Sequence, residues 1–321
     1  MRFGLLYELQ LPRPWTDGAE HRMIHEALAE VELADQLGFD YVWANEHHFL
    51  EEYSHSSAPE VFLAAAAART TQIHVGHAVV LSPPGYNPPA RVAERIATLD
   101  LIASGRVEWG TGLSASRTEI EGFNIEHETR REQWAEATEQ TANMLAMDPY
   151  PGFEGRFFSM PCRNVVPKPF QKPHPPLWIA CSNRETIHAA ARAGIGALAF
   201  AFIDPTEAAK WVKEYYDIIK SDECVPIGHA VNANLAMATG FSVHHDEAEA
   251  KARGLEDSSI SVLRWGISTS KASTGPEPPI YGNASRSLGP HCPTWRAATA
   301  SARRRSCGTV WRNTRRPGSI R

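Results

Sequence analysis

Short apolar runs of strand length alternate with amphipathic segments of helix length along most of the chain. The first run, FGLLY, is followed by a segment of helical periodicity that ends at Gly38, a residue type that commonly terminates helices. The alternation predicts strands at 3–7, 40–44, 73–81, 106–112, 177–182, 197–203 and 229–243. It predicts helices at 20–37, 59–70, 89–103, 129–147, 183–194, 205–220 and 245–265. Residues 150–176, rich in Pro, Gly and aromatic residues, predict an irregular insertion with a short hairpin.

This succession of strand-then-helix units predicts parallel strands covered by helices, either as a closed barrel or as a doubly wound sheet. A doubly wound dinucleotide-binding domain would carry G-x-G-x-x-G after its first strand, where this chain has YELQLPRPW. We therefore predict an α/β fold of the TIM (β/α)8-barrel type. In such barrels the chemistry lies at the carboxyl ends of the strands. That rule directs attention to Glu8 and to residues 45–48, 77–83, 111–117, 181–184 and 201–204.

The C-terminal part differs in composition from the rest. Residues 266–321 lack the periodicity of the barrel segments, and no Asp or Glu follows Glu277. Nine of the 32 Lys and Arg residues lie beyond Glu277, so the body is acidic and the tail is basic. We therefore divide the chain into a barrel domain at 1–265 and an atypical tail at 266–321. We interpret the tail as disordered or as the product of a shifted reading frame. The eighth strand is then missing or replaced by this tail, and a missing strand would leave the edges of the first and seventh strands unpaired.

Composition and charge exclude several classes of protein. Apolar residues make up 43% of the 321 residues, which is enough for a large core. No stretch approaches the roughly twenty apolar residues that a membrane-spanning helix needs, and the N-terminus lacks the architecture of a signal peptide. The five cysteines are scattered and have no C-x-x-C spacing, which predicts neither a disulfide framework nor a zinc site and favours a cytoplasmic protein. Because the basic tail has no nucleic-acid-binding motif, we do not expect nucleic acid as a partner.

The sequence WANEHHF at residues 43–49 places three ionisable side chains directly after the second predicted strand. An imidazole titrates near neutral pH, so His47 or His48 suits proton transfer. A metal site would need further ligands that converge from other parts of the chain, which spacing does not identify. For an arbitrary pair of histidines, packing of one ring and solvation of the other is the commoner role.

Two longer segments carry a resemblance to a known family. GFDYVWANEHHF, followed by IHVGHAVVLSPPGYNPPARVAERIATLDLIASGRVEWGTG, resembles the bacterial luciferase-like, flavin-dependent monooxygenases (alkanal monooxygenase-like). The resemblance extends from Met1 to about residue 265. It implies a TIM barrel that binds reduced FMN and uses O2 to oxidise a small organic substrate. It also implies a separate NAD(P)H:flavin reductase that supplies the flavin, and it is compatible with a homodimer.

Two other functions stay open beside this one. Some relatives in the family use the deazaflavin F420 for hydride transfer, and the EHHF string favours FMN only modestly. A barrel that lacks its eighth strand also suits a non-catalytic flavin-binding protein, although the retained His47 argues for catalysis.

The resemblance assigns roles to residues around the isoalloxazine ring. His47 matches the active-site histidine that assists proton transfer beside the flavin, and Glu46 precedes it. Ala78 and Val79 match a pair joined by a non-prolyl cis peptide under the ring. Gly112 stands where the luciferase catalytic subunit has a reactive cysteine, so thiol-assisted chemistry is not expected here.

The phosphate group needs partners other than those of luciferase, because Leu113 replaces an arginine that contacts phosphate there. Ser182 is predicted as the N-cap of the helix after the fifth strand, with Asn183 in its first turn. Backbone N–H groups and the helix dipole attract anions at such a position, although a plain N-cap serine has the same features. Arg130, at the start of an earlier helix, matches another phosphate-contacting arginine, with Arg131 as the alternative.

Overall fold

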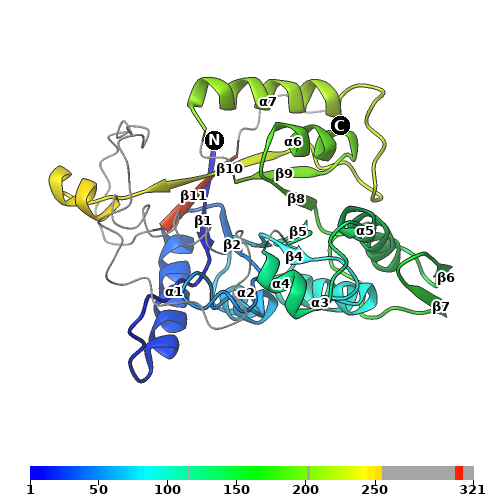
Figure 1. Ribbon diagram of the computed structural model, residues 1–321, viewed down its shortest axis with the longest axis horizontal. Helices are drawn as coiled ribbons and strands as arrows, with labels where there is room; N and C mark the ends of the chain where they lie inside the picture. The colour runs from blue at the N-terminus through cyan, green and yellow to red at the C-terminus, as the bar shows by residue number, and fades with distance from the viewer. Residues whose placement is uncertain (115, 201–202, 255–307, 314–321) are drawn as a thin grey trace.

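The computed structural model describes residues 1–114, 116–200, 203–254 and 308–313. Its centre is a barrel of parallel strands with helices around the outside (Figure 1). The parallel strands are β1 (Arg2–Tyr7), β2 (Tyr41–Ala44), β3 (His74–His77), β4 (Val80–Leu81), β5 (Val107–Gly112), β8 (Leu177–Cys181), β9 (Gly196–Ala199) and β10 (Leu235–Phe241). Around the barrel they pair in the order β1, β2, β3, β5, β8, β9, β10, and β4 pairs with β5 just beyond β3. The predicted TIM-type barrel is therefore confirmed, as seven parallel strands with a seam between β10 and β1.

The helices follow the predicted segments closely. Three of them start with proline at the first helical position, where its missing N–H costs no hydrogen bond. One short helix between β5 and the next long helix was not predicted, and only residues 247–254 of the predicted helix at 245–265 are described as helical. The helices are α1 (Ala19–Gln36), α2 (Pro59–Arg69), α3 (Pro89–Ile102), α4 (Arg117–Gly122), α5 (Arg130–Ala146), α6 (Arg184–Arg192) and α7 (Pro205–Ile219).

A strand from the C-terminal tail lies in the seam of the barrel. This strand, β11 (Gly308–Asn313), pairs antiparallel with β1 on one side and with β10 on the other (Figure 1). The expectation of unpaired edges is therefore wrong, whereas replacement of the eighth strand by the tail is confirmed. The reason is that an antiparallel strand also presents N–H and C=O groups to both neighbours, and the TVW sequence in β11 consists of strand-forming residue types. The interpretation of the tail as disordered is wrong for residues 308–313, which form β11. The predicted boundary at 265 and the rest of the tail, 266–307 and 314–321, lie outside the described residues.

The irregular insertion contains the predicted hairpin, formed by β6 (Tyr150–Glu154) and β7 (Ser159–Arg163), which projects from the barrel (Figure 1). Two predicted strands were too long. The one at 73–81 is interrupted at Ala78–Val79, between β3 and β4. The one at 229–243 begins only at Leu235, because Asn232 hydrogen-bonds to the carbonyls of Gly194 and Leu177 before the strand starts.

The interior of the barrel is filled with side chains. Trp43 and Trp178 are almost fully buried and their rings meet edge to face at 5.4 Å. Glycine on the neighbouring strand makes room for Trp43, since a Cβ at Gly76 would lie 2.4 Å from its ring. Because the interior is a packed core, chemistry is confined to the ends of the strands.

Within the residues that the structure describes, no helix combines the length and the apolar character needed to cross a membrane.

Candidate active site

His47 and His48 lie at the carboxyl end of β2, and both contact a carboxylate from a distant part of the chain. The Nδ1 atom of His47 is 2.9 Å from Oε1 of Glu119, and the backbone N–H of His48 donates to the same oxygen at 2.8 Å. The hydroxyl of Ser114 donates to the other Glu119 oxygen at 2.5 Å. Glu119 is fully buried on α4, whereas the side chain of His47 keeps 15% of its surface exposed. The histidine therefore has one ring edge held by Glu119 and some access to the barrel mouth.

The charge of this pair follows from its surroundings. Burial by itself would lower the pKa of His47, but the hydrogen bond to Glu119 and the charges of Glu119, Glu8 and Glu46 outweigh it and raise the pKa. Burial would likewise raise the pKa of Glu119, and the hydrogen bond and charge of His47 bring it below its ordinary value. The pair therefore favours an imidazolium beside a carboxylate. In this state His47 holds a proton that it can donate.

Glu46 anchors the backbone on the other side of the histidines. One of its oxygens is 3.0 Å from Nε2 of His48, and the other accepts the backbone N–H of Leu81 at 2.8 Å. Leu81 lies in β4, directly after Ala78 and Val79, so Glu46 connects the ends of β2 and β4. Glu46 is 6% exposed, and both of its carboxylate oxygens take part in hydrogen bonds. Its main role is therefore to hold the backbone between Ala78 and Leu81 in place.

A third carboxylate, Glu8, comes from the end of β1. It accepts hydrogen bonds from the hydroxyl of Tyr53 at 2.7 Å and from the amide of Gln10 at 2.8 Å. Burial raises the pKa of Glu8, and these two donors and the charge of His47 oppose the rise. Glu8 and Glu46 at two strand ends and Glu119 on α4 therefore surround His47, and their charge is one cause of its raised pKa.

The peptide bond between Ala78 and Val79 is cis, as predicted. The N–H of Ala78 donates to the carbonyl of Ala44 at 2.7 Å, which places this bond beside the end of β2. A Cβ at Gly112 would lie 2.2 Å from Cγ2 of Val79, so β5 approaches the Ala78–Val79 segment at a distance that only glycine allows. The end of β5 and the Ala78–Val79 segment therefore lie directly against each other.

Of the two candidate arginines, Arg130 is the one that turns toward the barrel. Its guanidinium donates to the carbonyl of Ser114 at 2.6 Å and to the carbonyl of His127 at 3.0 Å, whereas Arg131 is exposed on the surface. Arg130 therefore contacts Ser114, the residue whose hydroxyl also holds Glu119.

The prediction that Ser182 caps the helix is wrong. The N-cap of α6 is Asn183, whose side chain accepts the N–H of Thr186 at 3.0 Å while the Thr186 hydroxyl accepts the N–H of Asn183 at 3.2 Å. Asparagine competes well with serine for this position, and the reciprocal bond with Thr186 favours it further. Ser182 precedes the cap and is exposed, and the neighbouring Arg184 is paired with Glu214. An exposed hydroxyl and a helix N-terminus therefore lie at the end of β8, next to β5.

These features fit a flavin mononucleotide. The buried side-chain oxygen of Asn45, directly after β2, has no hydrogen-bond partner among the described residues. The guanidinium of Arg130 lies beside Ser114, on the same side of the site as Glu119. In the part of the chain that the structure describes, no group of three or more His, Cys, Asp or Glu residues is arranged to hold a metal ion.

Sequence reasoning missed Glu119 and Ser114. A signal was present, because Ser116 and Glu119 have the S-x-x-E spacing that commonly starts a helix. The structure confirms Ser116 as the N-cap of α4, accepting the N–H of Glu119. The carboxylate of Glu119, however, turns to His47 instead of returning to the cap.

Comparison with known proteins settles the family. A family model described as luciferase-like monooxygenase matches residues 1–301. The chain belongs to the luciferase-like monooxygenase family. The match to the luciferase-like monooxygenases includes the strands and helices that carry His47, Glu119 and the Ala78–Val79 segment.

Individual relatives extend this comparison. The crystal structure of monooxygenase RslO1 from Streptomyces bottropensis has a TM-score of 0.73 and 29% identity, and the match covers 84% of this chain and 80% of that one. The oxygenase component of the flavin-dependent trigonelline monooxygenase of Acinetobacter baylyi is 26% identical over 190 residues, 57% of this chain and 49% of that protein. The F420-dependent glucose-6-phosphate dehydrogenase of Amycolatopsis mediterranei is 28% identical over 167 residues, 51% of this chain and 49% of that protein. The chain thus spans about half the length of these two curated relatives.

Proposed function

We propose that this protein is the oxygenase component of a flavin-dependent monooxygenase, which binds reduced FMN and uses O2 to oxidise a small organic substrate. The observation that carries the proposal is the His47–Glu119 pair, at 2.9 Å, beside the cis peptide of Ala78–Val79 at the carboxyl end of the barrel. A proton donor of raised pKa next to a site for a flat ring is what oxygen chemistry on a flavin requires.

Each residue of the site has a separate task in this proposal. His47 holds and donates a proton at Nε2, because its Nδ1 is engaged with Glu119. Ala78, Val79 and Gly112 form the floor for the ring, and Glu46 holds that floor through Leu81. When bound, reduced flavin supplies the electrons and the atom that reacts with O2.

The phosphate of FMN would lie near the ends of β5 and β8. Arg130 supplies positive charge there, and Ser182 and Asn183 supply a hydroxyl and the N-terminus of α6. The exposed Ser182 side chain is free of a capping role, which supports it as a phosphate ligand.

A separate NAD(P)H:flavin reductase would supply the reduced flavin. Support comes from the absence of a nicotinamide-binding G-x-G-x-x-G sequence after the first strand and from the relative whose name specifies an oxygenase component.

Use of F420 for hydride transfer is the second candidate, because a relative of similar identity is named as F420-dependent. Titration of the purified protein with FMN, FAD, F420 and NAD, each followed by fluorescence or absorbance, separates these cofactors. We expect the tightest binding for FMN, and then oxygen consumption in the presence of a flavin reductase, NADH and a panel of small ketones and terpenes. Binding of F420 without FMN would move the protein to the second candidate. Flavin binding with no oxidised product from any substrate would favour a non-catalytic flavin-binding protein.

A further inference from the structure

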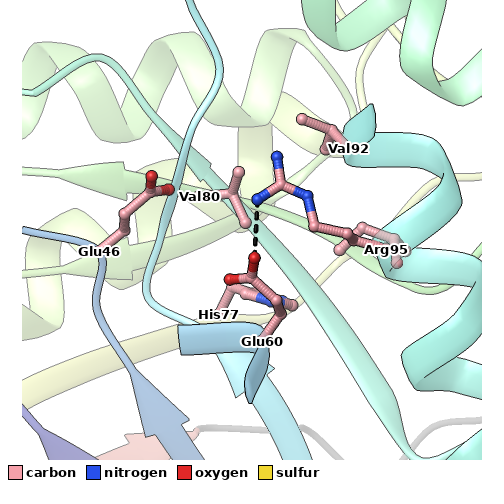
Figure 2. A pocket seen from close by; sticks show the side chains of 7 residues that line it. Glu46, Glu60, His77, Val80, Val92 and Arg95 are labelled. Carbon is pink, nitrogen blue, oxygen red and sulfur yellow. Dashed lines mark hydrogen bonds and ion pairs between the residues drawn. The ribbon is translucent and has the colours of Figure 1, made fainter. Parts of the chain in front are cut away.

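Four polar side chains form a continuous hydrogen-bonded path from the site to the outer helices. Asn87 donates to Oε1 of Glu46 at 2.9 Å and to the carbonyl of Leu81 at 2.9 Å. Arg95, on α3, donates to the amide oxygen of Asn87 at 2.6 Å and to Oε1 of Glu60, on α2, at 2.7 Å. Figure 2 shows the Arg95–Glu60 ion pair, with Glu46 on the other side of Val80. The path therefore joins the flavin end of the barrel to two helices on its outside.

The chemistry of the path selects an amide at position 87. An asparagine side chain has one acceptor oxygen and one nitrogen with two donor hydrogens. Its oxygen meets a guanidinium, which only donates, and its nitrogen meets a carboxylate and a carbonyl, which only accept. Aspartate would place a third acceptor against Glu46 and Leu81, and leucine would leave a buried carboxylate without this donor.

A small polar cavity adjoins the same path. Its volume is about 10 Å³, which is close to the room that one water molecule needs. Glu46, Glu60, His77 and Arg95 supply its polar lining (Figure 2), together with the apolar Val80, Val92 and Ile96.

His77 is 1% exposed in this lining, and its Nδ1 atom has no hydrogen-bond partner among the described residues. Burial lowers the pKa of His77, the charge of Glu60 opposes this and that of Arg95 adds to it, and together they bring the pKa to about 4. The ring is therefore neutral near pH 7, and Arg95 is the cation that balances the carboxylates of the path.

We infer that Asn87 and Arg95 are positioning residues for the flavin end of the barrel. They hold Glu46, and Glu46 in turn sets the place of His48 and of the Leu81 backbone after the Ala78–Val79 segment. The inference rests on the proposed function. A simple stabilising ion pair would need only Arg95 and Glu60 at the outside, whereas Arg95 directs its second nitrogen inward to Asn87.

The test compares Asn87→Asp with the double variant Glu46→Gln/Asn87→Asp. The single variant sets two carboxylates against each other, and we expect FMN affinity to fall about 10- to 100-fold. In the double variant the glutamine amide donates to the new carboxylate and its oxygen still accepts the Leu81 N–H. We therefore expect most of the lost affinity to return. Arg95→Lys, which keeps the charge but loses the two-sided contact, should weaken binding less than Asn87→Asp.

Arg192→Lys is the matched control, because Arg192, at the C-terminal end of α6, forms an exposed pair with Glu223. It should leave FMN affinity within about twofold, as expected for surface pairs. Hydrogen exchange of residues 78–88 in the cofactor-free protein gives a second readout. Asn87→Asp should speed exchange in this segment, and the double variant should slow it again.

The outcomes separate this inference from the proposed function. Wild-type protein that binds neither FMN nor F420, while exchange at 78–88 responds as expected, would overturn the function and leave the positioning role. Wild-type FMN binding with unchanged affinity and unchanged exchange in Asn87→Asp would overturn the positioning role alone. An Asn87→Asp defect that the Glu46→Gln change does not relieve would also overturn it.

Discussion

Charged side chains at the two ends of the barrel differ in their hydrogen-bond partners. At the amino end, the Asp35 carboxylate accepts the backbone N–H groups of Thr71, Gln72 and Ile73 and also the Thr71 hydroxyl. Arg106, just before β5, donates to four backbone carbonyls, those of Ala67, Thr70, Ile73 and Ala103. At the carboxyl end, the buried carboxylates Glu46 and Glu119 contact imidazoles as well as backbone N–H groups.

This difference in partners separates stability from chemistry. A backbone N–H or C=O cannot change its protonation near neutral pH, so a charge bound to it fixes a turn and does nothing else. An imidazole can gain or lose a proton there, so a carboxylate bound to it sets the pKa of an acid or a base. His74 and Glu108 form an imidazole–carboxylate pair at the amino end too, at 3.0 Å, so the contrast holds for Asp35 and Arg106 against Glu119 and not for every buried charge.

Replacing His47 should give the largest effect at the carboxyl end. We expect His47→Ala to lower the rate of substrate oxidation about 10²- to 10⁴-fold, because a positioned proton donor is lost. FMN affinity should change little, whereas the midpoint of urea unfolding should fall, because the buried Glu119 carboxylate loses its partner. Reductase-coupled oxygen consumption with product analysis measures the rate, and His48→Ala is the control. Full activity in His47→Ala with an inactive His48→Ala would reverse the assignment within the pair.

Replacing Asp35 should lower stability and leave the active site unchanged. Asp35→Ala leaves the backbone donors of Thr71, Gln72 and the buried Ile73 without their acceptor, so the free energy of unfolding should fall by roughly 3 kcal/mol. FMN affinity of the folded protein should stay near that of the wild type. Urea unfolding measures the change, with Glu32→Ala, which removes an exposed pair with Arg69, as the control. A variant that keeps its stability but loses FMN binding would erase the distinction between the two ends.

Glu119→Gln should change the pH dependence more than the fold. The folded-state pKa of His47 is raised, so its contribution to stability is complete below about 6.5 and is lost as pH rises through the folded pKa. The pKa of Glu119 is lowered, so its contribution is present above about 4.5 and is lost as pH falls through the folded pKa. Between about pH 4.5 and 6.5 both contributions are present, and removing the Glu119 charge should lower the free energy of unfolding there by about 1.5–3 kcal/mol. Outside this range the stability of the variant should depend less on pH than that of the wild type.

The same variant should move the alkaline limb of the activity profile to lower pH, because His47 then loses its proton more easily. Urea midpoints and initial rates across pH measure both effects. An unchanged alkaline limb would show that another group controls the proton.

The smallest effect is expected at Gly112. An alanine there would put its Cβ 2.2 Å from Val79, so the Ala78–Val79 segment must shift. We expect a loss of about 1–3 kcal/mol in the free energy of unfolding, together with weaker FMN binding. Gly240→Ala is the control, because a Cβ at Gly240 meets nothing within 4 Å. Equal effects of the two substitutions would mean that close approach at Gly112 has no part in the site.

Much of the site could be predicted from the local sequence, and the wrong predictions also have local causes. The EHHF string after a predicted strand identified His47 and Glu46, because the end of a parallel strand is where a barrel places its chemistry. Ser182 was taken for the cap because serine and asparagine are adjacent and both cap helices well, and only the bond with Thr186 distinguishes them. The antiparallel β11 was not predicted, because its short TVW run lies in a tail whose composition differs from that of the barrel.

The sequence by itself determined the succession of strands and helices, the insertion hairpin and the strand end that carries the histidines. These depend on periodicity and on residues close together in the chain, so they are present in any short window. Only the tertiary structure decided that Glu119, 72 residues from His47, is its partner, that Asn87 holds Glu46, and that a tail strand lies between β1 and β10. Such contacts arise when distant segments are packed against one core, and hydrophobic periodicity carries no record of which polar side chains then meet.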